Sequence, residues 1–105
     1  MPIVPRLYIQ PSELEGAILR AKLKLQGDVK SIRYSLDPDW SGDPSIFFRV
    51  VLTDGASQPA HLRQISQRVA LTLMDEVRTD DFGIHAYFDF RSESEQRMLR
   101  DPDWD

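Results

Sequence analysis

Two kinds of hydrophobic spacing alternate along this chain of 105 residues, and the alternation limits its fold more than any other feature. Apolar residues recur every three or four positions over 12–26 and again over 59–78, as on one face of an amphipathic helix. Over 29–36, 46–53 and 84–90, apolar and polar residues alternate, which is typical of half-buried strands. Because each helix has one apolar stripe, both helices must pack against a sheet.

The predicted element order, (β)αββαβ(α), indicates an α+β fold, a two-layer sandwich with both long helices on one sheet face. A first strand at 3–9 is optional, because Pro5 suits only an edge strand. If that segment pairs, the fold is ferredoxin-like with a split β-α-β unit, and otherwise it is a three-stranded variant. A right-handed helical crossover makes 46–53 and 84–90 parallel. The length fits a single domain, 1–105.

Local signals give the expected ends of the helices. Ser12 and Glu15 have the spacing of a capping box at the start of the first helix, and Pro59 suits the first turn of the second. Another capping box over 92–95 opens a short helix in the acidic C-terminal segment, 92–105. The residues expected in one core are Leu14, Ile18, Leu62, Ile65, Val69, Leu73, Phe48, Val50 and Phe88.

The composition excludes several classes of chemistry. The chain has no cysteine, which excludes disulfides, thiolate zinc sites and cysteine nucleophiles. The formal net charge of −4 disfavours nonspecific binding to nucleic acid or anionic lipid. The sequence shows neither the pattern of a secretory signal nor an apolar stretch long enough to span a bilayer, so we expect a cytoplasmic protein with no membrane partner.

The loop between the first two predicted strands resembles the start of a calcium-binding loop. Asp37, Asp39 and Ser41 stand where oxygen ligands are needed, and Gly42 stands at the turn. However, the position that should supply a closing bidentate Glu is Phe48, and the flanking segments have strand periodicity. We therefore interpret the loop as a hairpin connection whose carboxylates cap their own backbone.

Neither histidine has a metal-binding neighbour at a suitable spacing on its own element. His61 lies in the second helix, and His85 shares a strand face with Tyr87 and Asp89, so Asp89 would reach His85 only across Tyr87. The chain also has no nucleophile-turn motif and no glycine-rich phosphate loop. We therefore expect no metal site, no cofactor and no catalytic residue.

The sheet face opposite the helices is the candidate working surface, because it mixes aromatic, apolar and guanidinium groups, as interaction sites do. Alternatively, the C-terminal segment folds back over this face with Met98, Leu99 and Trp104. That segment repeats at 101–104 the Asp-Pro-Asp-Trp of 37–40, which is too short to indicate a structural repeat. The residues expected on an open face for partner binding are Arg33, Phe47, Arg49, Val51, His85, Tyr87 and Asp89, with Arg91 beside them.

These features favour a non-catalytic protein-interaction or regulatory module that acts as a homodimer or as a subunit of a partner. RNA binding on the same face is the alternative, since aromatic residues stack on bases and Arg33, Arg49 and Arg91 would meet phosphates. The segment 45–52 lacks the pattern of the RNA-recognition motif, and the negative charge opposes RNA affinity. A metal-dependent protein centred on 37–43 is the third hypothesis.

Overall fold

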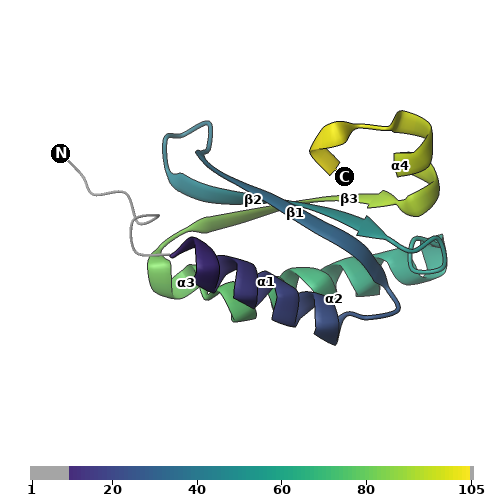
Figure 1. The fold of residues 1–105 in the computed structure, drawn as a ribbon, viewed down its shortest axis with the longest axis horizontal. Coiled ribbons are helices and arrows are strands. Elements are labelled where there is room, and N and C mark those ends of the chain that lie inside the picture. Colours follow the sequence, from purple (N-terminus) through teal and green to yellow (C-terminus); the bar gives the residue numbers. More distant parts are fainter. Residues whose placement is uncertain (1–9, 105) are drawn as a thin grey trace.

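The fold is a two-layer α+β sandwich, seen in a computed structural model that describes residues 10–104 (Figure 1). A three-stranded mixed sheet has two long helices on one face and the C-terminal segment on the other. No helix among these residues is long and apolar enough to cross a bilayer. The elements are α1 (Pro11–Lys24), β1 (Val29–Pro38), β2 (Pro44–Leu52), α2 (Pro59–Val77), α3 (Thr79–Phe82), β3 (His85–Ser92), α4 (Glu93–Leu99) and the 3-10 helix η2 (Pro102–Trp104).

The sheet has the order β1-β2-β3, with β1 antiparallel to β2 and β2 parallel to β3. The predicted parallel pair is confirmed, and α2 forms the connection between its strands. A split β-α-β unit has a further strand between two such strands. Because β2 and β3 pair directly, the described residues form the three-stranded variant. The optional strand at 3–9 lies outside the described residues.

The helix ends show which local signals determine the structure. The capping box at Ser12 was a wrong prediction: α1 begins at Pro11 with Gln10 as its N-cap, and no side chain caps it. Since Pro11 fits the first helical position without losing a hydrogen bond, Ser12 already lies inside the first turn. The start of α2 at Pro59 is confirmed, and so is the capping box that opens α4 at Ser92.

The core lies between the helices and the sheet face formed by alternate residues of β2 and β3. Of the nine predicted core residues, eight belong to the cluster or pack against it. Leu62 is the exception, with 39% of its surface exposed, because the contacts of α2 with the core begin one turn later, at Ile65. The fully buried side chains of β2 are Ile46, Phe48, Val50 and Leu52, as alternation requires.

The C-terminal segment folds back onto the opposite sheet face, where α4 and η2 contact β2 (Figure 1). Trp104 is buried there, as the self-coverage alternative expected. Met98 and Leu99 are exposed, so their predicted role in covering the face was wrong. A short α4 places only one of its residues, Gln96, in a buried position and turns the two apolar side chains outward.

Candidate functional site

The sheet face away from α1 and α2 is divided into two parts. The part around Val51 and Arg91, which are paired in register, is covered by α4 and η2 and is called here the covered end. The part around Phe47 and Tyr87, also paired in register, is called the open end. The two parts are neighbours on the same strands, so the C-terminal segment determines which of the predicted binding residues stay accessible.

Arg91 holds the C-terminal segment on the covered end. Its guanidinium carbon lies 4.2 Å from the centre of the Trp104 ring, a cation–π contact. Its two terminal nitrogens reach Gln96 Oε1 at 3.1 Å and Asp101 Oδ2 at 3.5 Å. Val51 beneath this layer is only 3% exposed, so its side chain does not belong to an open binding surface.

Arg49 marks the boundary between the two ends. Its Nε donates to the carbonyl oxygen of Asp103 at 2.8 Å, and its Nη1 donates to Ser35 Oγ on β1 at 3.1 Å. The guanidinium is therefore tied to the C-terminal segment and to the sheet. Arg33 and Asp89 are the register partners of Arg49 on the two neighbouring strands, and both are exposed.

Three aromatic rings form the open end. Phe47 and Tyr87 stack with their centroids 5.1 Å apart, and Trp40 packs on Tyr87 at 5.4 Å in a tilted arrangement. Trp40 is 84% exposed. It was not among the predicted binding residues, although a tryptophan in an otherwise polar turn was a signal that the sequence offered.

A groove of about 580 Å³ lies beside these rings on the open end. It crosses all three strands, because β1, β2 and β3 each contribute residues to it. Its charged lining includes carboxylates as well as Arg49. The lining residues are Ser35, Asp37, Pro38, Phe47, Phe48, Arg49, Tyr87, Phe88 and Asp89.

Asp39 organises the turn that carries Trp40. Its Oδ1 accepts from the Ser41 backbone N–H at 2.9 Å, from Ser41 Oγ at 2.6 Å and from the Asp43 N–H at 3.1 Å. Its Oδ2 accepts from the Tyr87 hydroxyl at 2.8 Å. The predicted hairpin connection, in which a carboxylate caps its own backbone, is therefore confirmed.

These hydrogen bonds also change the protonation of the groups involved. The pKa of Asp39 lies well below its usual range, and the Ser41 hydroxyl is the largest cause. Burial, the next in size, opposes it, and the Tyr87 hydroxyl and the backbone N–H groups of Asp43 and Ser41 lower the pKa further. The hydrogen bond between the Tyr87 hydroxyl and Asp39 raises the pKa of Tyr87, because only the neutral phenol is able to donate it. The Asp39 carboxylate is thus ionised at neutral pH and fixes the Tyr87 ring under Trp40.

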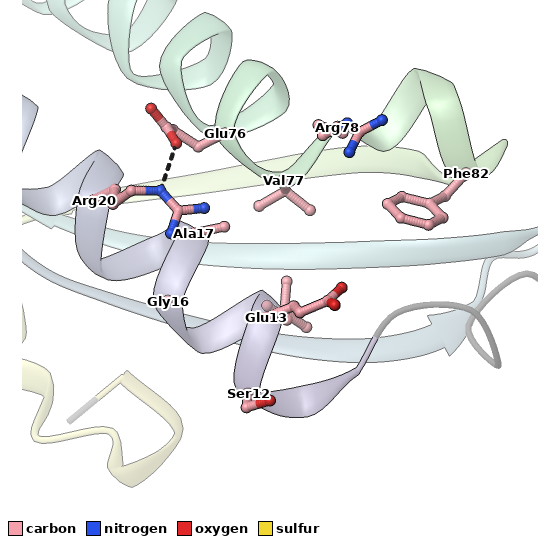
Figure 2. Close-up of a pocket in the computed structure, with 10 residues that line it drawn as sticks. Ser12, Glu13, Gly16, Ala17, Arg20, Glu76, Val77, Arg78 and Phe82 are labelled. Atoms are coloured by element: carbon pink, nitrogen blue, oxygen red, sulfur yellow. Dashed lines mark hydrogen bonds and ion pairs between the residues drawn. The ribbon is translucent and has the colours of Figure 1, made fainter.

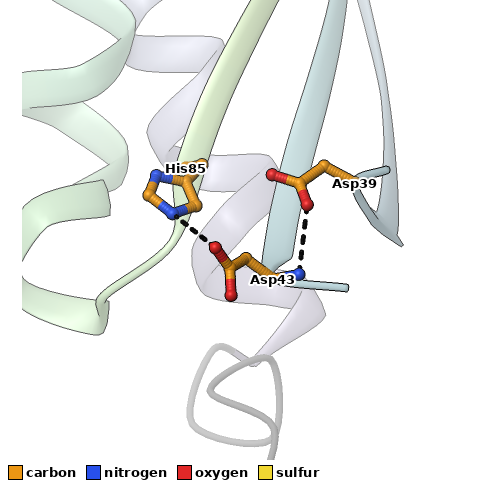
Figure 3. A group of neighbouring side chains, drawn as sticks. All are labelled: Asp39, Asp43 and His85. Atoms are coloured by element: carbon orange, nitrogen blue, oxygen red, sulfur yellow. Dashed lines mark hydrogen bonds and ion pairs between the residues drawn. The ribbon is translucent and has the colours of Figure 1, made fainter. Parts of the chain in front are cut away.

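His85 meets a carboxylate that the sequence spacing did not indicate. Its Nε2 lies 3.4 Å from Asp43 Oδ2 (Figure 3), whereas the sequence had offered Asp89 as the nearest candidate. One ligand-type atom from each of Asp39, Asp43 and His85 lies within 4.8 Å of the other two. Asp43 ends the turn and His85 begins β3, so the parallel pairing of β2 and β3 brings them together.

A second hollow, of about 300 Å³, lies between α1 and the end of α2 (Figure 2). Two of its charged groups pair across it, because Arg20 Nε donates to Glu76 Oε1 at 3.0 Å. Lys24, outside the lining, pairs with the other oxygen of Glu76. The hydrogen bonds from Lys24 and Arg20 lower the pKa of Glu76. These contacts connect the two helices, which is a structural role.

In comparisons with known proteins, no family model, no curated protein and no solved structure matches the chain.

Proposed function

We propose that this protein is a small non-catalytic interaction module that binds a partner protein through the open end. The observation that carries the proposal is the exposed ring of Trp40, held on Tyr87 beside Phe47. The groove beside these rings offers a recess for a partner's side chain. Aromatic anchors of this kind often supply most of the binding free energy of an interface.

Hydrogen bonds hold the turn and one ring of the open end in place. Asp39 fixes the turn through backbone hydrogen bonds and fixes Tyr87 through its hydroxyl. A surface that is ordered before binding loses less conformational entropy when the partner arrives. The exposure of Trp40 supports a binding role as well, because exposed apolar patches on a folded protein mark either an interaction site or a risk of aggregation.

The charges around the rings favour one kind of partner. Four carboxylates surround the open end, against the guanidiniums of Arg33 and Arg49, of which Arg49 is already hydrogen-bonded. A partner surface with apolar and basic groups complements this pattern, whereas a second copy or an RNA backbone brings further negative charge. The carboxylates belong to Asp37, Asp39, Asp43 and Asp89.

The test compares the variant Trp40→Ala with a control variant, Leu71→Ala, which removes an exposed apolar side chain from the helical layer. Partners of the wild type are captured from an extract of the source cell, identified by mass spectrometry, purified and titrated by calorimetry. We expect Trp40→Ala to weaken binding by about 2 kcal/mol or more and Leu71→Ala to leave it unchanged. Circular dichroism of both variants should match the wild type.

Three results would overturn the proposal. Equal binding by Trp40→Ala and the wild type would place the interface elsewhere. A dimer in light scattering that Trp40→Ala dissolves would replace the basic partner with a second copy of this chain. A low-salt shift of single-stranded RNA that Trp40→Ala abolishes would favour the RNA-binding alternative.

A further inference from the structure

We propose that Asp39, Asp43 and His85 form a binding site for a divalent zinc-type metal ion. Two carboxylates come from the turn before β2, and one imidazole comes from the first residue of β3 (Figure 3). The inference is argued from the three side chains alone and not from the proposed partner, although Asp39 and Asp43 also belong to the four carboxylates around the open end.

The chemistry of the three donors selects the class of metal. Imidazole nitrogen with carboxylate oxygen suits zinc and its first-row neighbours, and three protein ligands leave a fourth position for water. Calcium takes six to eight oxygen ligands, which this cluster does not supply. Asp37, which the calcium-loop pattern required, is outside the cluster. The site is therefore different from the calcium loop that the sequence resembles.

The distance between two of the donors already fits an ion. His85 Nε2 and Asp43 Oδ2 are 3.4 Å apart. Two ligands at about 2.0–2.1 Å from a tetrahedral zinc ion lie roughly 3.3 Å from each other. Both side chains are more than half exposed, so an ion has access and the rotamers have room to adjust.

Asp39 is oriented for coordination by the groups around it. Three donors from Ser41 and Asp43 occupy Oδ1, while Tyr87 is the one donor to Oδ2 among residues 10–104. A carboxylate oxygen has two lone pairs, so Oδ2 keeps one for a metal. Hydrogen bonds to the other oxygen are the outer-shell support that metal-binding carboxylates have in known sites.

The negative charge of the cluster also favours a cation. Two carboxylates lie side by side in the turn, and Ser41 Oγ contacts both of them. A divalent cation bound between them would offset both negative charges. An ion there would also connect the turn before β2 to the start of β3, two segments that are distant in sequence.

The experiment titrates zinc chloride into the full chain and follows the heat. We expect saturable binding of one ion. His85→Ala and Asp43→Asn should each weaken it by at least about tenfold, because each removes a ligand and the loss of a mere outer-shell partner already costs that much. The matched controls are His61→Ala, which removes the other histidine, and Asp37→Asn, which changes a carboxylate next to the cluster. Both controls should bind zinc as the wild type does.

A second readout separates specific binding from adhesion to surface charges. Zinc should raise the thermal midpoint of the wild type but not that of His85→Ala, because an ion that binds only the folded state stabilises it. The absence of saturable heat would overturn the proposal. So would zinc binding that survives His85→Ala and is lost in His61→Ala, or calcium binding tighter than zinc binding.

The metal site and the partner surface share Asp39 and Asp43, but one variant distinguishes the failure of one proposal from the failure of the other. Trp40→Ala should keep the zinc affinity of the wild type, because its side chain is not a ligand. If Trp40→Ala loses the partner and still binds zinc, both proposals stand. If the wild type binds the partner but no zinc, only the metal site is rejected.

Discussion

The tetrapeptide Asp-Pro-Asp-Trp occurs at 37–40 and at 101–104, and its two copies place tryptophan at opposite ends of one sheet face with opposite results. Trp40 lies on Tyr87 and is 84% exposed, whereas Trp104 lies on Arg91 and is 7% exposed. The same four residues therefore do not determine burial. The two copies lie in different elements: the first begins in the last two residues of β1 and leaves Trp40 in the turn, while the second follows α4 and places Trp104 in η2.

The covered end and the open end also differ in what their contacts do: one set stabilises the fold, and the other set orders a surface for binding. At the covered end, the hydrogen bonds of Arg91 and Arg49 connect the C-terminal segment to the sheet and bury Val51. At the open end, hydrogen bonds fix the turn and Tyr87, while the Trp40 ring stays exposed and the rings of Phe47 and Tyr87 stay half-buried. We infer that substitutions at the covered end change mainly the free energy of unfolding and that substitutions at the open end change mainly binding.

The largest effect is expected on the helical side of the open end, where Phe48 is fully buried. Phe48→Ala should lower the free energy of unfolding by about 3–5 kcal/mol, because it leaves a cavity in the core. Its neighbour Phe47 points to the other face, and Phe47→Ala should lose about 1 kcal/mol, the value of one aromatic pair. Urea unfolding of the two variants measures the difference, and equal losses would mean that the strand faces are reversed.

The next largest effect on stability is expected at Trp104, and it is compared with the effect at Trp40. Trp104→Ala should lower the stability by roughly 2–3 kcal/mol, because it removes a buried ring and its contact with Arg91. The loss stays below that of Phe48→Ala because the segment is able to detach locally. Trp40→Ala should lower the stability by no more than about 1 kcal/mol, the value of its one pair with Tyr87, because the ring is otherwise exposed. Should Trp40→Ala prove the more damaging of the two, the division of the face would be disproved.

The covered end should also loosen in acid. The Ser94 hydroxyl and backbone N–H hold the pKa of Asp54 below its usual value of 3.8 and attach α4 to the turn after β2. Because the folded pKa is the lower one, this stabilisation is present above pH 3.8 and is lost as the pH falls through the folded value.

Hydrogen exchange of the Ser94 amide, which donates to Asp54 Oδ1 at 3.0 Å, measures this loosening. Protection should fall on acidification in the wild type. In Asp54→Asn it should be weak at neutral pH and should change little with acid. Equal pH dependence in the two proteins would show that Asp54 does not hold α4.

The smallest effect is expected at the two apolar residues that do not cover the face. Met98 and Leu99 are exposed, so replacing both with Ser should change the stability by less than about 0.5 kcal/mol each. Thermal unfolding followed by circular dichroism is sufficient to measure this. A larger loss would mean that α4 packs these side chains against the sheet in solution.

The parts of the fold that were predictable are those set by local periodicity. Alternation alone assigns Phe48 and Phe47 to opposite faces, and the spacing of α2 assigns Val69 and Leu73 to the core. Leu62 has the same spacing but lies a turn before the core contacts begin, which depends on how far the sheet extends under the helix. Periodicity carries no information on that extent.

The candidate site was less predictable, because it depends on contacts between distant segments. Tyr87 and Phe47 could be placed on one face from their strands, but the bond from Tyr87 to Asp39 depends on the shape of a turn. The pair of His85 with Asp43 arises only from the register of β2 with β3. Whether the C-terminus covers one end or the whole face is also a tertiary property, since it depends on where Arg91 meets Trp104.

Hydroxyl-radical footprinting, read by mass spectrometry on the free protein and on its complex with the purified partner, tests the division of the sheet face most directly. In the free protein, Trp40 should be oxidised rapidly and Trp104 slowly, in line with their exposure. In the complex, Trp40 should become protected while Trp104 keeps its low rate. If Trp40 stays fully reactive in the complex, or if Trp104 is the residue that gains protection, the open end is not the binding surface.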